Sequence, residues 1–111
     1  MQLNLSKQKC KPCEGGVSPL NRADVKKMLP KIKGWKLLKG KLSKNFKFKD
    51  FKQALKWINK VGALAEKEGH HPDIYWFYNK INLVLYTHAI DGLSWNDFIL
   101  ASKINNLGGF K

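Results

Sequence analysis

The chain lacks any apolar run of about 18 residues, which is the length that a membrane-spanning helix requires. Its opening segment, 1–7, also lacks the apolar stretch of a signal peptide, so we expect a protein of the cytoplasm that does not enter a membrane. With 111 residues, 43% of them hydrophobic, the chain is large enough to bury its own core. We therefore expect a single domain over residues 1–111, with an N-terminal arm over 1–19.

Arginine is almost absent, because Arg22 is the only one among the 21 basic residues. The net charge of +13 would suit a nucleic-acid-binding protein, since cations that neutralise phosphates dominate that kind of binding. Base recognition, however, favours bidentate arginine, and the lysines here are spread along the whole chain instead of being concentrated in one groove. Composition therefore favours a lysine-rich surface in solvent over a nucleic-acid surface, and the same charge would suit an anionic small molecule.

Cysteine is also scarce: Cys10 and Cys13 form one Cys-x-x-Cys motif, followed by the loop-like sequence 14–19. A thioredoxin-type redox motif should open a helix after a strand, and a four-cysteine zinc site would need a second pair. We therefore expect an incidental or local structural role for this motif, with metal binding and redox activity as the alternatives.

Hydrophobic spacing predicts three helices and two hairpins. In chain order they are a helix over 18–30 that begins at Ser18, a hairpin over 34–48, a helix over 50–69, a hairpin over 73–88 and a helix over 94–107. The order predicts an α+β fold in which two similar ββα units form one four-stranded antiparallel sheet, with the helices packed on one face and an N-terminal helix before them. The helix over 50–69 has two apolar faces, so one should cover the sheet and the other is free to meet another subunit.

The three histidines lie close together in the sequence and carry its main chemical signal. His70 and His71 follow the long helix, and Pro72 keeps His71 out of the helical conformation, so the two rings should point in different directions. His88 is expected at the end of a strand. Histidine titrates near neutrality, so a cluster of three suits proton transfer or metal ligation.

Two carboxylates are candidates to orient these rings. Glu66 stands one helical turn before His70, and Asp97, in the first turn of the last helix, could orient His88. A zinc site made by both cysteines and two histidines is conceivable, although adjacent histidines lack the separation found in common zinc-finger sites. Each histidine alone also has a plain structural interpretation, such as a partner of a helix dipole. The residues by themselves therefore leave catalysis, metal ligation and structure open.

A set of motifs in order along the chain adds a resemblance. The motifs are Cys10-Lys-Pro-Cys13, Gly34-Trp35, Glu66-x-x-x-His70-His71-Pro72, Tyr78-Asn79-Lys80, Thr87-His88 and Gly92-Leu93-Ser94-x-x-Asp97. Taken together, at their spacings over residues 10–104, they resemble the pterin-4a-carbinolamine dehydratase family.

The resemblance implies dehydration of 4a-hydroxytetrahydropterin to quinonoid dihydropterin by histidine acid–base catalysis, in the recycling of a tetrahydrobiopterin-type cofactor. It also implies the same two-unit fold, a homodimer or homotetramer, and no metal or cofactor of the protein's own. Carried over by position, the catalytic residues would be His70, His71 and His88, supported by Asp97 and Glu66, and the substrate would contact His71, Asp73 and Tyr75. Animal relatives double as dimerisation partners of a transcription factor, so the alternative is a binding or regulatory protein with a protein partner.

Overall fold

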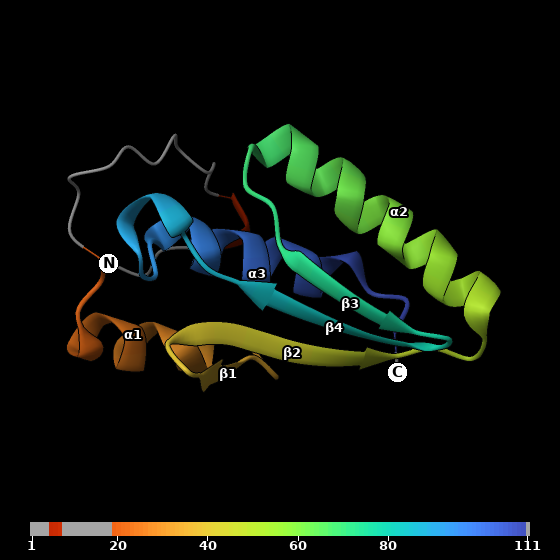
Figure 1. The fold of residues 1–111 in the computed structure, drawn as a ribbon, viewed down its shortest axis with the longest axis horizontal. Coiled ribbons are helices and arrows are strands. Elements are labelled where there is room, and N and C mark those ends of the chain that lie inside the picture. The colour runs from red at the N-terminus through yellow and green to blue at the C-terminus, as the bar shows by residue number, and fades with distance from the viewer. Residues whose placement is uncertain (1–4, 8–18, 111) are drawn as a thin grey trace.

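Two β-hairpins form one four-stranded antiparallel sheet, and the helices lie on one side of it (Figure 1). The computed structural model describes residues 5–7 and 19–110. The strands are β1 (Lys36–Leu38), β2 (Lys41–Lys47), β3 (Asp73–Phe77) and β4 (Lys80–Leu85), in the spatial order β1-β2-β4-β3. The helices are α1 (Arg22–Met28), α2 (Phe51–Glu68) and α3 (Trp95–Leu107). Short 3-10 turns occupy Leu5–Lys7, Leu29–Lys31 and His88–Ile90. The predicted α+β architecture is confirmed.

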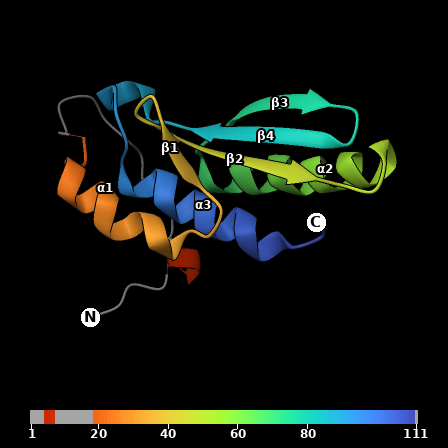
Figure 2. The same cartoon turned by 90° about the horizontal axis from the view of Figure 1, so that it is seen from below.

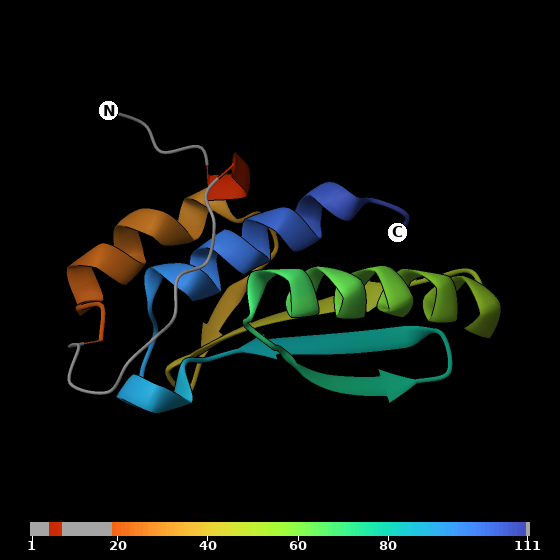
Figure 3. The ribbon, with the colours of Figure 1, turned by 90° about the horizontal axis from the view of Figure 1, so that it is seen from above.

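The helices form a layer over the sheet, as the two views perpendicular to Figure 1, from below and from above, show (Figures 2 and 3). In both views α2 and α3 lie against the sheet, and α1 runs beside α3. Among the described residues, no helix is both long enough and apolar enough to cross a lipid bilayer.

The long helix α2 begins and ends at the residues that the sequence indicates. The side chain of Asp50 accepts a hydrogen bond from the backbone N–H of Gln53 at 2.9 Å, which satisfies a free donor of the first turn. Gly69 ends the helix in the left-handed conformation, at a φ of 66°, which glycine adopts without steric cost. The length of α2 was therefore predictable from its two capping residues.

The first helix differs from the prediction. It begins at Arg22 and is capped by Asn21, whose side chain accepts from the backbone N–H of Asp24 at 2.8 Å. The chain just before this helix is hydrogen-bonded to the segment that precedes α3, because Leu20 donates its N–H to the carbonyl of Leu93 at 2.8 Å. The helix therefore starts after Asn21 and not at Ser18 as predicted. Ser18 lies outside the described residues, together with Cys10 and Cys13.

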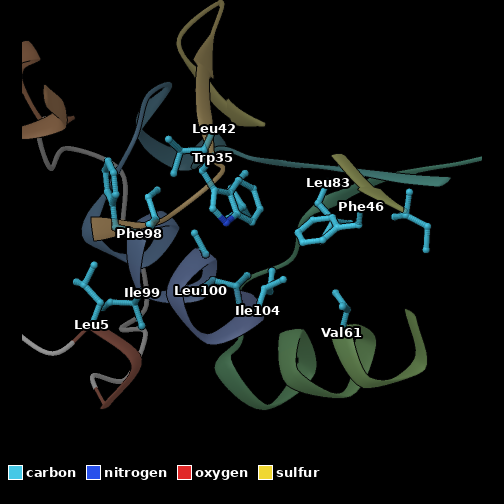
Figure 4. Packing of buried hydrophobic residues seen from close by; sticks show 14 of the residues in the cluster. Leu5, Trp35, Leu42, Phe46, Val61, Leu83, Phe98, Ile99, Leu100 and Ile104 are labelled. Atoms are coloured by element: carbon cyan, nitrogen blue, oxygen red, sulfur yellow. The ribbon is translucent and has the colours of Figure 1, made fainter. Parts of the chain in front are cut away.

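The core fills the space between the sheet and helices α2 and α3 (Figure 4). Alternate residues of β2 and β4 point into it, as the period of two predicted. Its aromatic centre is Phe46, whose ring lies 4.5 Å from that of Trp57 and meets Trp35 edge-on at 6.1 Å. The other large buried side chains of this cluster include Leu42, Ile81, Leu83, Leu85, Phe98, Leu100 and Ile104. This packing fixes the ends of α2, β4 and α3, where the polar residues gather.

Candidate active site

The three histidines, which come from two separate segments, line one pocket of about 280 Å³. His70 and His71 follow the C-terminal end of α2, and His88 follows strand β4. The pocket is lined by Gly69, His70, His71, Tyr86, Thr87, His88, Ala89 and Asn96. The structure thus brings together the three histidines that the sequence singled out.

His70 is held by a buried carboxylate. Its Nε2 lies 2.6 Å from Oδ1 of Asp97, and the side chains of the two residues are 10% and 0% exposed. The other oxygen of Asp97, Oδ2, accepts from the hydroxyl of Thr87 at 2.8 Å and from the backbone N–H of Ser94 at 2.9 Å. An ionised carboxylate can only accept, so a neutral His70 ring paired with it carries its hydrogen on Nε2 and has Nδ1 as its acceptor.

The same carboxylate also closes the start of α3. Ser94 and Asp97 form a capping box, in which the Ser94 side chain accepts from the backbone of Asp97 and the Asp97 side chain accepts from the backbone of Ser94. We had expected Asp97 to orient His88, and that pairing is wrong. Because the capping box turns the Asp97 side chain back under the first turn of α3, it faces the buried His70 instead of the exposed turn that holds His88.

His71 has a carboxylate partner too, but in solvent. Its Nε2 lies 2.6 Å from Oε1 of Glu66, with side-chain exposures of 57% and 80%. The predicted partner of Glu66 was His70, which would require helical geometry over four residues. Gly69 breaks the helix before His70, so the next residue along, His71, falls beside Glu66. An exposed pair of this kind contributes about 0–1 kcal/mol, so it orients His71 far less firmly than Asp97 orients His70.

The sequence had indicated that His88 ends a strand, but the structure places it on a turn. Strand β4 ends at Leu85, and Thr87 then pairs with Gly92 through two backbone hydrogen bonds of 2.9 and 3.3 Å. This pairing folds the chain back and places His88, which is exposed, at the start of the 3-10 turn His88–Ile90, whose last residue is buried. The ring of Tyr86 meets the His88 imidazole edge-on, with 5.2 Å between centroids.

Two predicted substrate contacts lie elsewhere. Asp73 and Tyr75 are exposed on β3, and neither lines the pocket. Conversely, sequence analysis missed Thr87 and Asn96, which are buried and line the pocket. Thr87 carried a usable signal: it is the polar member of an otherwise apolar series of inward-facing positions, and such a side chain needs a buried partner.

The described residues bear on metal ligation by the histidines and carboxylates, but not on ligation by Cys10 and Cys13. Over residues 5–7 and 19–110, no three histidine, cysteine, aspartate or glutamate side chains are grouped so that they could hold a metal ion. The two cysteines of the conceivable zinc site lie outside this part of the chain.

Comparison with known proteins supplies an independent line of evidence. A family model described as pterin 4 alpha carbinolamine dehydratase matches residues 18–107. Two relatives provisionally named pterin-4-alpha-carbinolamine dehydratase, from Alkaliphilus metalliredigens and Nitrosomonas eutropha, are 44% and 42% identical to this chain. The first match covers 92% of this chain and 94% of the relative, and the second covers 94% and 93%. A crystal structure described as a transcriptional coactivator/pterin dehydratase from Brucella melitensis superposes with a TM-score of 0.77 at 29% identity, over 81% of this chain and 98% of that one.

Proposed function

The chain belongs to the pterin-4a-carbinolamine dehydratase family, and we propose that its histidine pocket is where a 4a-hydroxytetrahydropterin loses water by acid–base catalysis. The observation that carries the proposal is the convergence of three histidines on one pocket, with one ring fixed by a buried carboxylate. The physiological substrate we propose is the hydroxylated form of a tetrahydrobiopterin-type cofactor, which is recycled in the cytoplasm after use by an aromatic amino-acid hydroxylase.

The reaction needs two proton transfers. The 4a-hydroxyl departs as water once it has gained a proton, and a ring nitrogen gives up its proton so that its electron pair forms the new C=N bond of the quinonoid dihydropterin. Two titratable groups on opposite sides of the pterin can perform both steps, and positioned acids and bases typically contribute about 10²–10⁴-fold each.

We assign these two transfers to His70 and His88. Asp97 occupies Nε2 of His70, which leaves Nδ1 as the nitrogen that can exchange a proton with the pterin. His88 reaches the same pocket from the turn after β4. We assign to His71, which also lines the pocket, the positioning of the pterin.

The test uses the purified protein, without added metal, and a carbinolamine generated by a pterin-dependent hydroxylase. We expect the wild type to accelerate loss of the carbinolamine, and His88→Ala to remove most of the acceleration. For His70 the variant is His70→Gln, whose amide can still donate to Asp97 and so protects the fold. An inactive wild type, or full activity in both variants with unchanged circular dichroism, would contradict the proposal.

We also propose that the chain assembles with a second copy of itself. Strand β3 is at the edge of the sheet and exposes the apolar side chains of Ile74 and Phe77. The neighbouring helix α2 exposes Phe51 and Leu55. A free antiparallel edge can pair with the same edge of another copy about a two-fold axis. Light scattering should report a dimer or tetramer that Ile74→Lys weakens, and a monomeric wild type at micromolar concentration would refute this.

A regulatory role is the second candidate, because the structurally similar Brucella protein is described as a transcriptional coactivator as well as a pterin dehydratase. If this chain acts through a protein partner, the histidine variants should still capture that partner. Loss of capture in the histidine variants would instead show that the partner binds at the histidine pocket.

A further inference from the structure

His88 is the least constrained of the three histidines. It is exposed on the 3-10 turn His88–Ile90, whereas the other two rings are each hydrogen-bonded to a carboxylate. Within the part of the chain that the structure describes, its imidazole makes no side-chain hydrogen bond and no ion pair. An exposed ring of this kind samples several rotamers, and catalysis by a positioned group requires that it mostly occupy one.

The ring of Tyr86 limits this freedom. It also lines the pocket, and it meets the His88 ring edge-on, with an interplanar angle of 77° and 5.2 Å between centroids. This is the arrangement that aromatic pairs prefer. Packing against the Tyr86 ring therefore favours a single orientation of the His88 ring.

Tyr86 is itself fixed at two other points. Its hydroxyl donates a hydrogen bond to Oδ1 of Asp91, and the ammonium group of Lys41 lies 4.8 Å from its ring centroid. The bond to Asp91 spans the loop that carries His88, since Tyr86 precedes the Thr87–Gly92 backbone pairing and Asp91 lies inside it. Asp91, whose carboxylate accepts this hydrogen bond, has a positive φ of 49°, which is uncommon for a residue other than glycine.

From this arrangement we propose that Tyr86, clamped by Asp91, is a positioning residue that fixes the imidazole of His88 in the pocket. The kinetic consequence rests on the proposed function, but the ordering of the ring does not. The ring of Tyr86 supplies the contact with His88, and the hydroxyl acts only by holding that ring in place. The two parts of the side chain can therefore be tested separately.

The experiment compares Tyr86→Ala, Tyr86→Phe and Asp91→Asn, with Tyr78→Ala as the control. Tyr78 is an exposed tyrosine in the β3–β4 turn and is not among the residues that line the pocket. Ordering of His88 is read by NMR of the free protein, as the three-bond couplings that report its χ1 rotamers, and contact with Tyr86 is read as the ring-current shift of the carbon-bound imidazole protons of His88. The chain has only three histidines, so these signals can be assigned by substitution. Turnover is read as kcat and KM separately.

We expect Tyr86→Ala to average the χ1 couplings of His88 over several rotamers, besides removing the shift that the Tyr86 ring itself causes, and to lower kcat by about 10–100-fold, with KM changed by no more than about threefold. Tyr86→Phe keeps the ring and loses the clamp, so its decrease in kcat should be smaller, about tenfold or less. Asp91→Asn should resemble Tyr86→Phe or the wild type, because an amide oxygen can still accept. Tyr78→Ala should leave both readouts unchanged.

Two results would overturn the proposal: a wild-type His88 whose protons show no ring-current shift, or a Tyr86→Ala variant that averages the χ1 couplings of His88 while keeping full kcat. If the wild type proves inactive, the proposed function fails. The NMR comparison then still decides by itself whether Tyr86 orders His88.

Discussion

Replacing Asp97 by asparagine should slow turnover strongly while largely preserving the fold. In the wild type, Oδ1 accepts from His70, and Oδ2 accepts from the hydroxyl of Thr87 and the N–H of Ser94. An asparagine has one oxygen and one NH₂ group at these positions. Its oxygen should keep the two donors at the start of α3, which leaves the NH₂ group to donate toward Nε2 of His70.

That donation reverses the tautomer of His70. Nε2 becomes the acceptor, the hydrogen moves to Nδ1, and the nitrogen that remains for the pocket can no longer accept a proton. The Ser-His-Asp triad provides a measured precedent in another protein class, where the corresponding Asp→Asn change lowers kcat by about 10⁴ through the wrong tautomer. We expect a decrease of about 10²–10⁴ here, since acid–base catalysis by one group has that range.

The loss of stability should be modest by comparison. Three hydrogen bonds to a buried charge become neutral ones, each weaker by about 1 kcal/mol. Part of that loss is offset because a buried charge no longer has to be desolvated. Urea denaturation should therefore show the free energy of unfolding lowered by about 1–3 kcal/mol.

Three measurements check this reasoning. They are kcat, the urea midpoint, and the ¹⁵N shifts of the His70 ring, which distinguish the two tautomers. The matched control is Asp50→Ala, which removes the side-chain cap of α2 and should cost about 1 kcal/mol without lowering kcat. If Asp97→Asn shows the reversed tautomer and still turns over at more than a tenth of the wild-type rate, His70 does not use Nδ1 as inferred.

Three further predictions concern other polar contacts. Glu66→Gln should lower the free energy of unfolding by less than about 1 kcal/mol, because the Glu66–His71 pair is exposed; a larger loss in urea denaturation would contradict this. Lys44→Met should lower it by about 1–2 kcal/mol at neutral pH, because the amine donates to a backbone carbonyl at 2.9 Å and an amide oxygen at 2.8 Å; no change in the urea midpoint would contradict this. The hydrogen bond to Asp91 raises the pKa of Tyr86 above its ordinary 10.0, with lost hydration and the charge of Asp91 acting in the same direction. Its stabilisation is therefore present below about pH 10 and lost as the pH rises through the raised pKa, and an absorbance titration should show that pKa lowered in Asp91→Asn.

The sequence predicted the elements with local causes. Asp50 and Gly69 are capping residues whose effect depends only on their own turn of chain, so they set the ends of α2 correctly. Apolar residues alternate along β4, and this local pattern correctly predicted the second hairpin. The start of the first helix was misplaced because serine and asparagine both favour the N-cap position of a helix. The sequence alone does not show whether Ser18 or Asn21 takes that position.

The carboxylate partners of the histidines could not be predicted in the same way. Spacing assigned Glu66 to His70, but the left-handed Gly69 rotates the chain so that Glu66 meets His71. Spacing placed Asp97 near His88, but the capping box turns it inward to His70. In both cases a backbone conformation at the end of an element redirects a side chain, and no periodic pattern records that conformation.

The sequence by itself thus determined the order of helices and hairpins, the shared sheet, and the choice of the three histidines as candidate site residues, because these follow from periodicity, caps and local chemistry. Only the tertiary structure decided which carboxylate holds which ring, and that Tyr86 and Asp91 brace the turn of His88. Those contacts form between segments that are adjacent only after α2, β4 and α3 have packed on the common core. Their geometry is therefore a property of the packing and not of any single stretch of chain.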